Sequence, residues 1–332
     1  MTYFPPNAPP RSAAPDSNRP AGPEPVRAPA PRLNLRQKFA AFWLGHLFWA
    51  AHHAPWYARF TVGFWITAAW LFSPALRRNT LANARHILGK DATDAQCRRL
   101  AKNTIRSFFM FVYDVGRHGR MSAQEMRQDV ASVEGSHHYD EAKKLGRGVI
   151  VATAHFGAFE SAVASLLETE PKIHVVFQRD RSGAFEQVRS RLHQRLGVIE
   201  HPIDDGLSAW ADIREALERG EAVLMQADRV MPGQRGTPMP FFDSHIEMPL
   251  GPAKLAAMTR SPIVPVFAVR LPGGKIRIEN HPAIHVDIAA QADSLSAAVS
   301  SLTQLIEVYV RKYPEQWLVI HQPWVRALQP HE

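Results

Sequence analysis

The segment 149–160, VIVATAHFGAFE, constrains both the fold and the chemistry of this chain more than any other. A run of β-branched and small apolar residues ends at His155, Gly157 supplies a turn, and an apolar helical pattern carrying Glu160 follows. This order predicts a strand, a turn and a helix, with an imidazole at the carboxyl end of the strand. The segment therefore places a candidate general base at a sheet edge, with a carboxylate expected to orient it.

The spacing of a histidine and an acid five positions apart is weak evidence alone, because the chain holds 16 His and 31 Asp and Glu residues. A second match, His86 and Asp91, occurs at a polar helix end with no strand before it. We interpret that match as coincidence. Only the pair His155 and Glu160 has the strand, the glycine and the apolar helix around it.

From residue 148 onward, the pattern alternates between short apolar runs and amphipathic stretches. The predicted strands are 148–154, 173–178, 222–227, 263–270, 275–280 and 317–321. The predicted helices are 157–169, 184–195, 207–219, 249–260 and 292–313. This alternation predicts an α/β fold, in which helices flank both faces of a central mixed sheet.

The N-terminal part of the chain differs in composition from the rest. Ten of the 26 prolines lie in the first 32 residues, so residues 1–34 are predicted to be a disordered tail, and they lack the apolar core of a secretory signal. Residues 35–76 are apolar and rich in tryptophan, and residues 77–328 are predicted to form the α/β domain.

Residues 60–76 contain no Lys, Arg, Asp or Glu and are bracketed by arginines. As a helix they would span about 25 Å, against a hydrocarbon core of about 30 Å. Tryptophan and tyrosine near the ends suit the membrane interface. We therefore predict a membrane-associated helical region before the sheet, and a buried helical hairpin is the alternative.

Composition limits the other classes of function. The single cysteine, Cys97, excludes a disulfide framework and any CxxC zinc or redox site. Motifs of the HExxH, P-loop and GxGxxG types are absent, so we predict no metal and no cofactor. The net charge of +8 suits an acidic partner such as anionic lipid, a carrier protein or nucleic acid. No nucleic-acid reader motif is present, and the apolar block argues against that partner.

The candidate chemistry is transfer to a hydroxyl. A neutral imidazole at His155 can take the proton of an attacking hydroxyl, while Glu160 holds the ring and stabilises the imidazolium. No GxSxG elbow is present, so direct attack by a substrate hydroxyl is favoured over an acyl-enzyme. The turn 156–158 opens a helix, and its backbone N–H groups, Gly157 included, are predicted to hold the developing oxyanion.

Four further residues are candidates for substrate binding. Arg179 follows a predicted strand, Arg195 lies near a helix end, and Asp228 with Arg229 follows another strand. Arginine forks suit phosphate and carboxylate groups, and carboxyl ends of strands are the usual ligand edge of such sheets. Arg189 and Arg191, also in the predicted helix 184–195, are two positions apart and therefore cannot share one helical face.

Taken together, short motifs in this order resemble the lipid A late acyltransferases, the lauroyl and myristoyl family of the lysophospholipid-acyltransferase-like superfamily. The matching motifs are GVI at 148–150, HFGAFE at 155–160, Arg179, RLG at 195–197, Asp228, PFF at 240–242, PLGPA at 249–253, SPIVPV at 261–266 and YPEQW at 313–317. The resemblance covers roughly residues 37–326.

The resemblance implies transfer of a fatty acyl chain from an acyl carrier protein or coenzyme A thioester to a hydroxyl of a lipid or glycolipid. A lipid A precursor of lipopolysaccharide biosynthesis is one acceptor, and other glycolipids stay open. It also implies a catalytic domain on the cytoplasmic face of the inner membrane, with His155 as base and Glu160 as its partner. Two alternatives remain: a non-catalytic lipid-binding protein on the same scaffold, and hydrolysis of the thioester by the same base.

Overall fold

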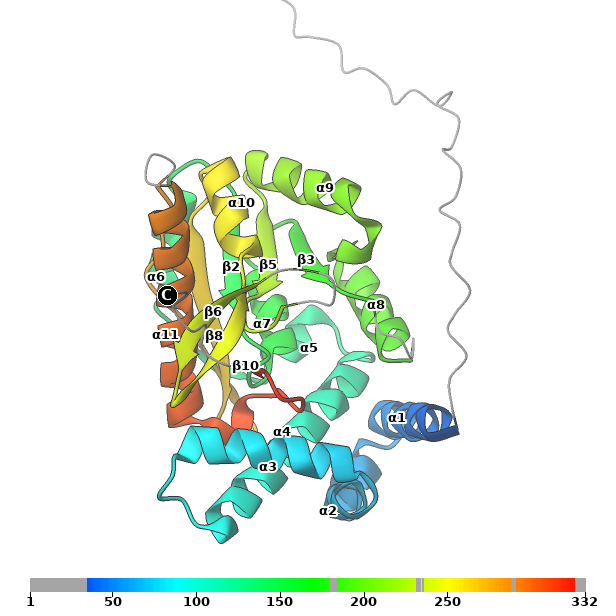
Figure 1. Cartoon of the computed structure of the whole chain (residues 1–332). Coiled ribbons are helices and arrows are strands. Elements are labelled where there is room, and N and C mark those ends of the chain that lie inside the picture. The colour runs from blue at the N-terminus through cyan, green and yellow to red at the C-terminus, as the bar shows by residue number, and fades with distance from the viewer. Residues whose placement is uncertain (1–34, 180–183, 231–233, 235, 288–290, 326–332) are drawn as a thin grey trace, which may run out of the picture. The chain divides into compact units, whose positions relative to one another are not determined.

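The structure is a computed structural model that describes residues 35–179, 184–230, 234, 236–287 and 291–325. The predicted disordered tail, 1–34, lies outside the described residues. The division of the chain at residues 34 and 76 stays a prediction. Helices and strands alternate through most of the described chain, as Figure 1 shows.

A central sheet of seven strands has the order β1-β9-β8-β2-β5-β3-β4. Its strands are β1 Val130–Glu134, β2 Val149–Thr153, β3 Ile173–Phe177, β4 Ile199–Pro202, β5 Ala222–Gln226, β8 Ile263–Arg270 and β9 Ile276–Asn280. Neighbouring strands run parallel except β8 and β9, which are antiparallel. The prediction of a mixed α/β sheet is confirmed, although β1 and β4 were not foreseen.

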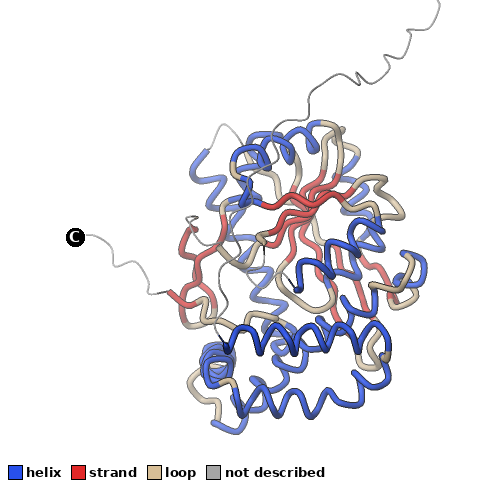
Figure 2. The backbone as a smooth tube through the Cα atoms, turned by 90° about the vertical axis from the view of Figure 1, so that its right-hand side faces the viewer, coloured by secondary structure: helices blue, strands red, loops and turns tan. Residues whose placement is uncertain are grey.

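Helices cover both faces of this sheet, as Figure 2 shows. These helices are α6 Ser136–Lys143, α7 Phe159–Leu166, α8 Ala184–Leu196, α9 Leu207–Glu218, α10 Gly251–Thr259 and α11 Gln291–Lys312. In β2, Val149 and Val151 pack on the face that α6 and α7 cover, while Ile150 and Ala152 pack under α9 and α10. A strand buried on both faces reads as a continuous apolar run, which explains the VIVA sequence.

A second sheet has the order β10-β7-β6 and consists of β6 Gly236–Phe241, β7 Ser244–Pro249 and β10 Trp324–Val325. The predicted strand 317–321 is wrong: only Trp317 forms a bridge, with Phe156, after the 3-10 turn Pro314–Gln316. Instead, this segment lies alongside the loop after β2, and the Leu318 N–H donates to the His155 carbonyl at 2.7 Å. It thereby supports the candidate base.

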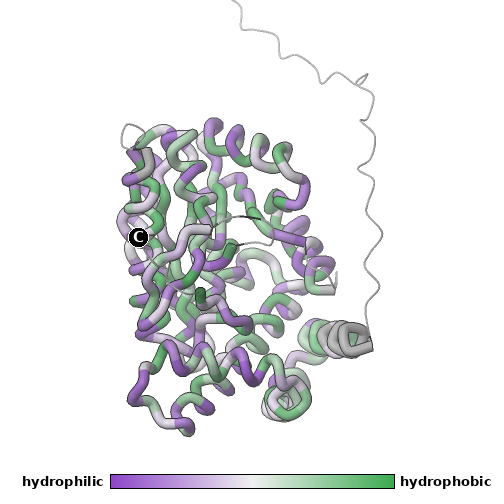
Figure 3. The backbone as a smooth tube through the Cα atoms, viewed as in Figure 1, coloured by the Kyte–Doolittle hydropathy of each residue, from purple (hydrophilic) through white to green (hydrophobic). Residues whose placement is uncertain are grey.

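The helices α1 Leu35–His53, α2 Pro55–Phe72, α3 Pro74–Leu88, α4 Asp94–His118 and α5 Ala123–Arg127 precede or border the sheet. Proline at the first position suits α2 and α3, and Thr93 with Gln96 forms a capping box at α4. Phe48 of α1 is buried against the α4 side of the molecule, whereas α2 leaves large apolar side chains exposed. Figure 3 shows the hydrophobic colouring of α2.

Across the described residues, no helix combines the length and the apolar character needed to cross a bilayer. The expected membrane-associated region therefore stays a proposal. The buried-hairpin alternative holds for part of α1, where Leu47 and Phe48 are buried, but not for α2, where Phe60 is 85% exposed.

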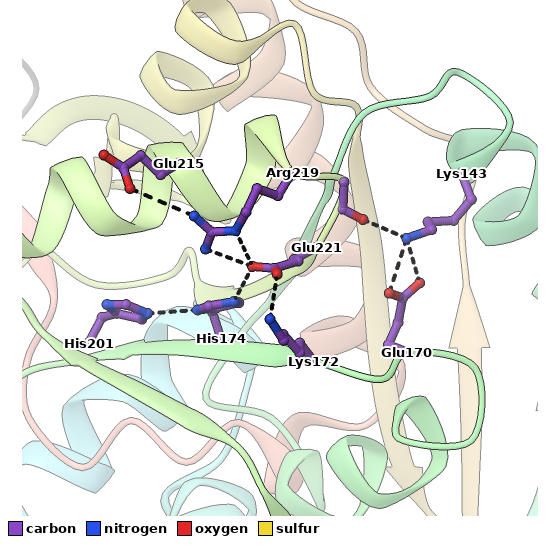
Figure 4. A network of polar contacts seen from close by, with 9 residues as sticks. Lys143, Glu170, Lys172, His174, His201, Glu215, Arg219 and Glu221 are labelled. Carbon is purple, nitrogen blue, oxygen red and sulfur yellow. Dashed lines mark hydrogen bonds and ion pairs between the residues drawn. The ribbon is translucent and has the colours of Figure 1, made fainter. Parts of the chain in front are cut away.

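A network of hydrogen bonds and ion pairs connects residues near the amino ends of β3 and β5, as Figure 4 shows. His174 lies between His201, at 2.8 Å, and Glu221, at 2.9 Å. Hydrogen bonds from Arg219, and then from Lys172 and His174, outweigh burial and lower the pKa of Glu221 to about 2. These contacts stabilise the edge of the sheet opposite the candidate site.

Candidate active site

The site forms where β2 and β5 end side by side. The two strands are parallel neighbours, with Thr153 opposite Gln226, and the pairing continues through the Ala227 N–H to the Thr153 carbonyl at 2.7 Å. His155 and Asp228 each follow the end of their strand by two residues. Because Thr153 and Gln226 are paired, and each candidate comes two residues after its paired strand end, the two side chains meet at the carboxyl edge of the sheet.

Asp228 is the carboxylate that holds His155. Its Oδ1 lies 2.7 Å from His155 Nδ1, and its Oδ2 accepts the His155 backbone N–H and the Trp317 indole N–H, each at 3.0 Å. Burial opposes ionisation, but the charge of His155 and these hydrogen bonds lower the pKa of Asp228. An ionised Asp228 accepts the Nδ1 proton, so the neutral tautomer of His155 that it selects carries its lone pair on Nε2.

A cavity of about 570 Å³ adjoins His155. Its wall is apolar, with phenylalanines from α4 and α7 and strand residues of β3, interrupted by a few polar and cationic side chains. Among the lining residues are Phe108, Phe111, His155, Phe159, Glu160, Phe177, Arg179, Arg189, His193, Arg229 and His321. Such a wall suits an apolar chain that carries a polar group at one end.

The expected partnership of His155 with Glu160 is wrong in this structure. Glu160 Oε2 lies 3.2 Å from His193 Nε2, and His193 Nδ1 lies 2.7 Å from Glu200. After the turn at Gly157, Glu160 sits in the first turn of α7 and faces α8 instead of the end of β5. Burial opposes ionisation of Glu160, but the charge and hydrogen bond of His193 lower its pKa.

The predicted oxyanion donors of the turn 156–158 are already used. The N–H of Gly157 donates to the Gln316 carbonyl at 2.9 Å, and that of Ala158 donates to the Ala268 carbonyl at 3.0 Å. The N–H of Phe156 donates to the Ala154 carbonyl. Gly157 has a φ of +60°, and a Cβ there would lie 2.0 Å from the Ala268 oxygen. The glycine therefore serves a close backbone approach.

Of the three arginines predicted to bind substrate, two line the cavity at His155 and one does not. Arg229 lines the cavity, and its role in substrate binding stays a prediction. Arg179 lies at the cavity edge but is held by Asp205 through two bonds, at 2.6 and 3.1 Å. Arg195 does not line this cavity: its guanidinium donates to the carbonyls of residues 118, 119 and 121 at the end of α4. The structure therefore does not bring Arg195 to the cavity at His155, and its role as a substrate ligand stays a prediction.

Sequence reasoning missed His193, Arg189 and Trp317. Arg189 and His193 are four apart in α8, so they share the face that turns toward the cavity, and this spacing was a usable signal. The Arg189 guanidinium lies 4.0 Å from the centre of the Phe177 ring. The carboxylates Glu160 and Glu200 outweigh burial and raise the pKa of His193 to about 9, so it is an imidazolium.

The layered α/β sheet thus carries a histidine and an aspartate at its carboxyl edge, beside an apolar cavity. The model of the bacterial lipid A biosynthesis acyltransferase family matches residues 30–326. The chain belongs to this family, as the motifs of its sequence predicted.

Relatives with a similar sequence include phosphatidylinositol mannoside acyltransferases. One from Mycolicibacterium smegmatis is 23% identical over 213 residues, which cover 64% of this chain and 66% of the relative. One from Mycobacterium tuberculosis strain H37Rv is 24% identical over 201 residues, 59% of this chain and 60% of the relative. The chain thus spans somewhat less than two thirds of the length of these two relatives.

Proposed function

We propose that this protein transfers a fatty acyl chain from an acyl carrier protein or coenzyme A thioester to a hydroxyl of a lipid or glycolipid. The observation that carries the proposal is the hydrogen bond between His155 Nδ1 and the buried Asp228 beside the cavity. This contact leaves Nε2 of His155 free to act as the base.

In the proposed reaction, the acceptor hydroxyl oxygen attacks the thioester carbonyl carbon while its proton passes to Nε2 of His155. Asp228 stabilises the imidazolium that forms. When the tetrahedral intermediate collapses, the carbon–sulfur bond breaks and the leaving thiolate takes the proton from His155. Because the turn N–H groups are occupied, we assign stabilisation of the oxyanion to the cationic wall, with Arg229 as the foremost candidate.

A second cavity, of about 240 Å³, supports an acyl chain as the transferred group. We call it the acyl slot. It lies over the sheet between α6 and α7, and its floor includes Val151, Leu224 and Val266. Phe159 and Leu224 line both the acyl slot and the cavity at His155, so the two spaces adjoin. An acyl chain bound at His155 would extend past Phe159 into this slot.

Filling the acyl slot is expected to shorten the preferred acyl chain. Ser165 lines the slot from α7, and its buried hydroxyl has no hydrogen-bond partner among the described residues, so Leu fits there chemically. Each lost methylene contact is worth about 0.8 kcal/mol. Ser165→Leu should therefore lower the ratio of kcat/KM for long over short thioesters about tenfold or more. An unchanged ratio, equal to that of Ser301→Leu on the exposed face of α11, would refute the slot.

The acceptor and the cellular location are proposed from the family, the relatives and the surface of α2. The family and the relatives' names favour a glycolipid acceptor, either a lipid A precursor or a mannosylated phosphoinositide. The exposed apolar side chains of α2 suit association with the cytoplasmic face of the inner membrane. We propose both on these grounds, with no cofactor or metal in the reaction.

The proposal is tested with purified protein in neutral detergent, a total lipid extract, and labelled acyl thioesters of carrier protein and of coenzyme A. We expect a new acylated lipid whose mass identifies the acceptor and whose donor dependence identifies the carrier. Release of free fatty acid alone would assign a hydrolase. No turnover by folded protein across chain lengths and both donors would leave a lipid-binding protein instead.

A further inference from the structure

A groove of about 780 Å³ lies away from the catalytic cavity, between α1, α4 and α8. We call it the α1–α4–α8 groove. Phe48, Trp49 and the two histidines at the end of α1 line one side, and Val188, Arg191 and Arg195 of α8 line the other. None of the described residues that line it is acidic.

Two arginines at this groove donate hydrogen bonds to backbone carbonyls. Arg195 donates to carbonyls at the end of α4, and Arg120 donates to the His52 carbonyl at the end of α1, at 2.7 Å. Burial lowers the pKa of His52, and the nearby charges of His53, Arg120 and Arg195 lower it further. The groove is therefore a region of positive potential without a lining counter-charge.

Arg191 adds a cation that no described residue neutralises through an ion pair. It is exposed, it lies one helical turn before Arg195, and it makes no hydrogen bond or ion pair with another described residue. The prediction that Arg189 and Arg191 lie on different faces of their helix is confirmed: Arg189 lines the catalytic cavity, and Arg191 lines this groove. An arginine of this kind suits a phosphate group.

An apolar stripe begins at the groove. Trp49 lines the groove and is 56% exposed. Trp56, Phe60 and Phe64 follow at spacings of four on one face of α2, and all are exposed. Tryptophan beside arginine is the composition of a surface that meets lipid headgroups and acyl chains together.

We propose that the α1–α4–α8 groove binds the phosphate headgroup of an anionic phospholipid while the stripe on α1 and α2 enters the bilayer. This inference rests on the proposed function, because it names the surface that brings the enzyme to its lipid acceptor. A bilayer is favoured over a soluble acidic protein because Trp49, which lines the cationic groove, is exposed, and because α2, the next helix along the chain, carries a row of exposed aromatic rings.

The test is cosedimentation of the full chain with phosphatidylcholine vesicles, with and without phosphatidylglycerol. Arg191→Glu is expected to weaken binding to the phosphatidylglycerol vesicles about tenfold or more, because it reverses a charge at the headgroup. Binding to pure phosphatidylcholine should change little. The matched control is Arg214→Glu on α9, where Arg214 pairs with Glu218 on the surface.

Unchanged binding of Arg191→Glu, or an equal loss in the Arg214→Glu control, would overturn the proposal. Selective loss of turnover with acyl carrier protein donors, at unchanged vesicle binding, would also overturn it and assign the groove to the carrier protein. Failure of the proposed function is separable, since it appears as absent transfer by wild type in neutral detergent without vesicles.

Discussion

Replacing Asp228 by Asn is expected to lower the rate of acyl transfer about 10²–10⁴-fold, the range of a lost general-base contribution. The substituted amide would carry no charge to stabilise the imidazolium of His155, and it can select the wrong ring tautomer. The buried site and the Trp317 hydrogen bond preserve the shape of the side chain, so the variant should fold. The measurement is kcat with a saturating thioester.

The chain offers a matched control for this substitution. Asp243 also lies 2.7 Å from a histidine Nδ1, that of His86, but this pair connects α3 to the small sheet and lines neither the catalytic cavity nor the acyl slot. Asp243→Asn should leave kcat near the wild-type value. Equal losses in the two variants would mean that the Asp228 contact is structural only.

Replacing Glu160 by Gln is expected to lower the free energy of unfolding by about 3–5 kcal/mol, because it removes one partner of a buried ion pair. His193 would keep Glu200 but lose the charge that faces it from α7. Chemical unfolding measures the loss. The exposed pair of Arg214 and Glu218 supplies the control, Glu218→Gln, with an expected change below about 1 kcal/mol.

The same ion pair makes stability depend on pH in a defined direction. The pKa of His193 is raised to about 9 from 6.5, so its contribution is complete below pH 6.5 and is lost as the pH rises through 9. The pKa of Glu200 is lowered to about 2, so its contribution is lost as the pH falls from about 4.5 toward 2. Wild type should therefore lose stability from pH 7 to pH 9 more steeply than Glu160→Gln. Parallel curves would contradict the charged state of His193.

The sheet was largely predictable because its strands are short apolar runs between helical patterns. Strands near 148–154, 173–178, 222–227, 263–270 and 275–280 were found in this way, and all belong to the central sheet. The strands of the central sheet that were missed, β1 and β4, lie at its two edges, where half-exposed residues dilute the apolar signal. The second sheet, β6, β7 and β10, was not predicted either. The segment 317–321 has the composition of a strand but lies alongside the loop after β2 without forming a strand.

The site was predictable in part. His155 was identified from its place after a buried strand, and Asp228 from the same kind of position, but their contact depends on β2 and β5 being neighbours in register. Proximity in the sequence favoured Glu160 as the partner of His155. After the turn at Gly157, however, Glu160 faces α8 and bonds to His193. The occupied N–H groups of that turn reflect distant partners, Gln316 and Ala268, which no local pattern reveals.

The central claim, that His155 is the base of an acyl transfer, is tested most directly by comparing His155→Ala with His86→Ala in the same thioester-to-lipid assay. Both histidines have a carboxylate at Nδ1, but only His155 adjoins the cavity. We predict that His155→Ala forms no acylated lipid above background, while His86→Ala transfers at close to the wild-type rate. Wild-type turnover by folded His155→Ala would contradict the account.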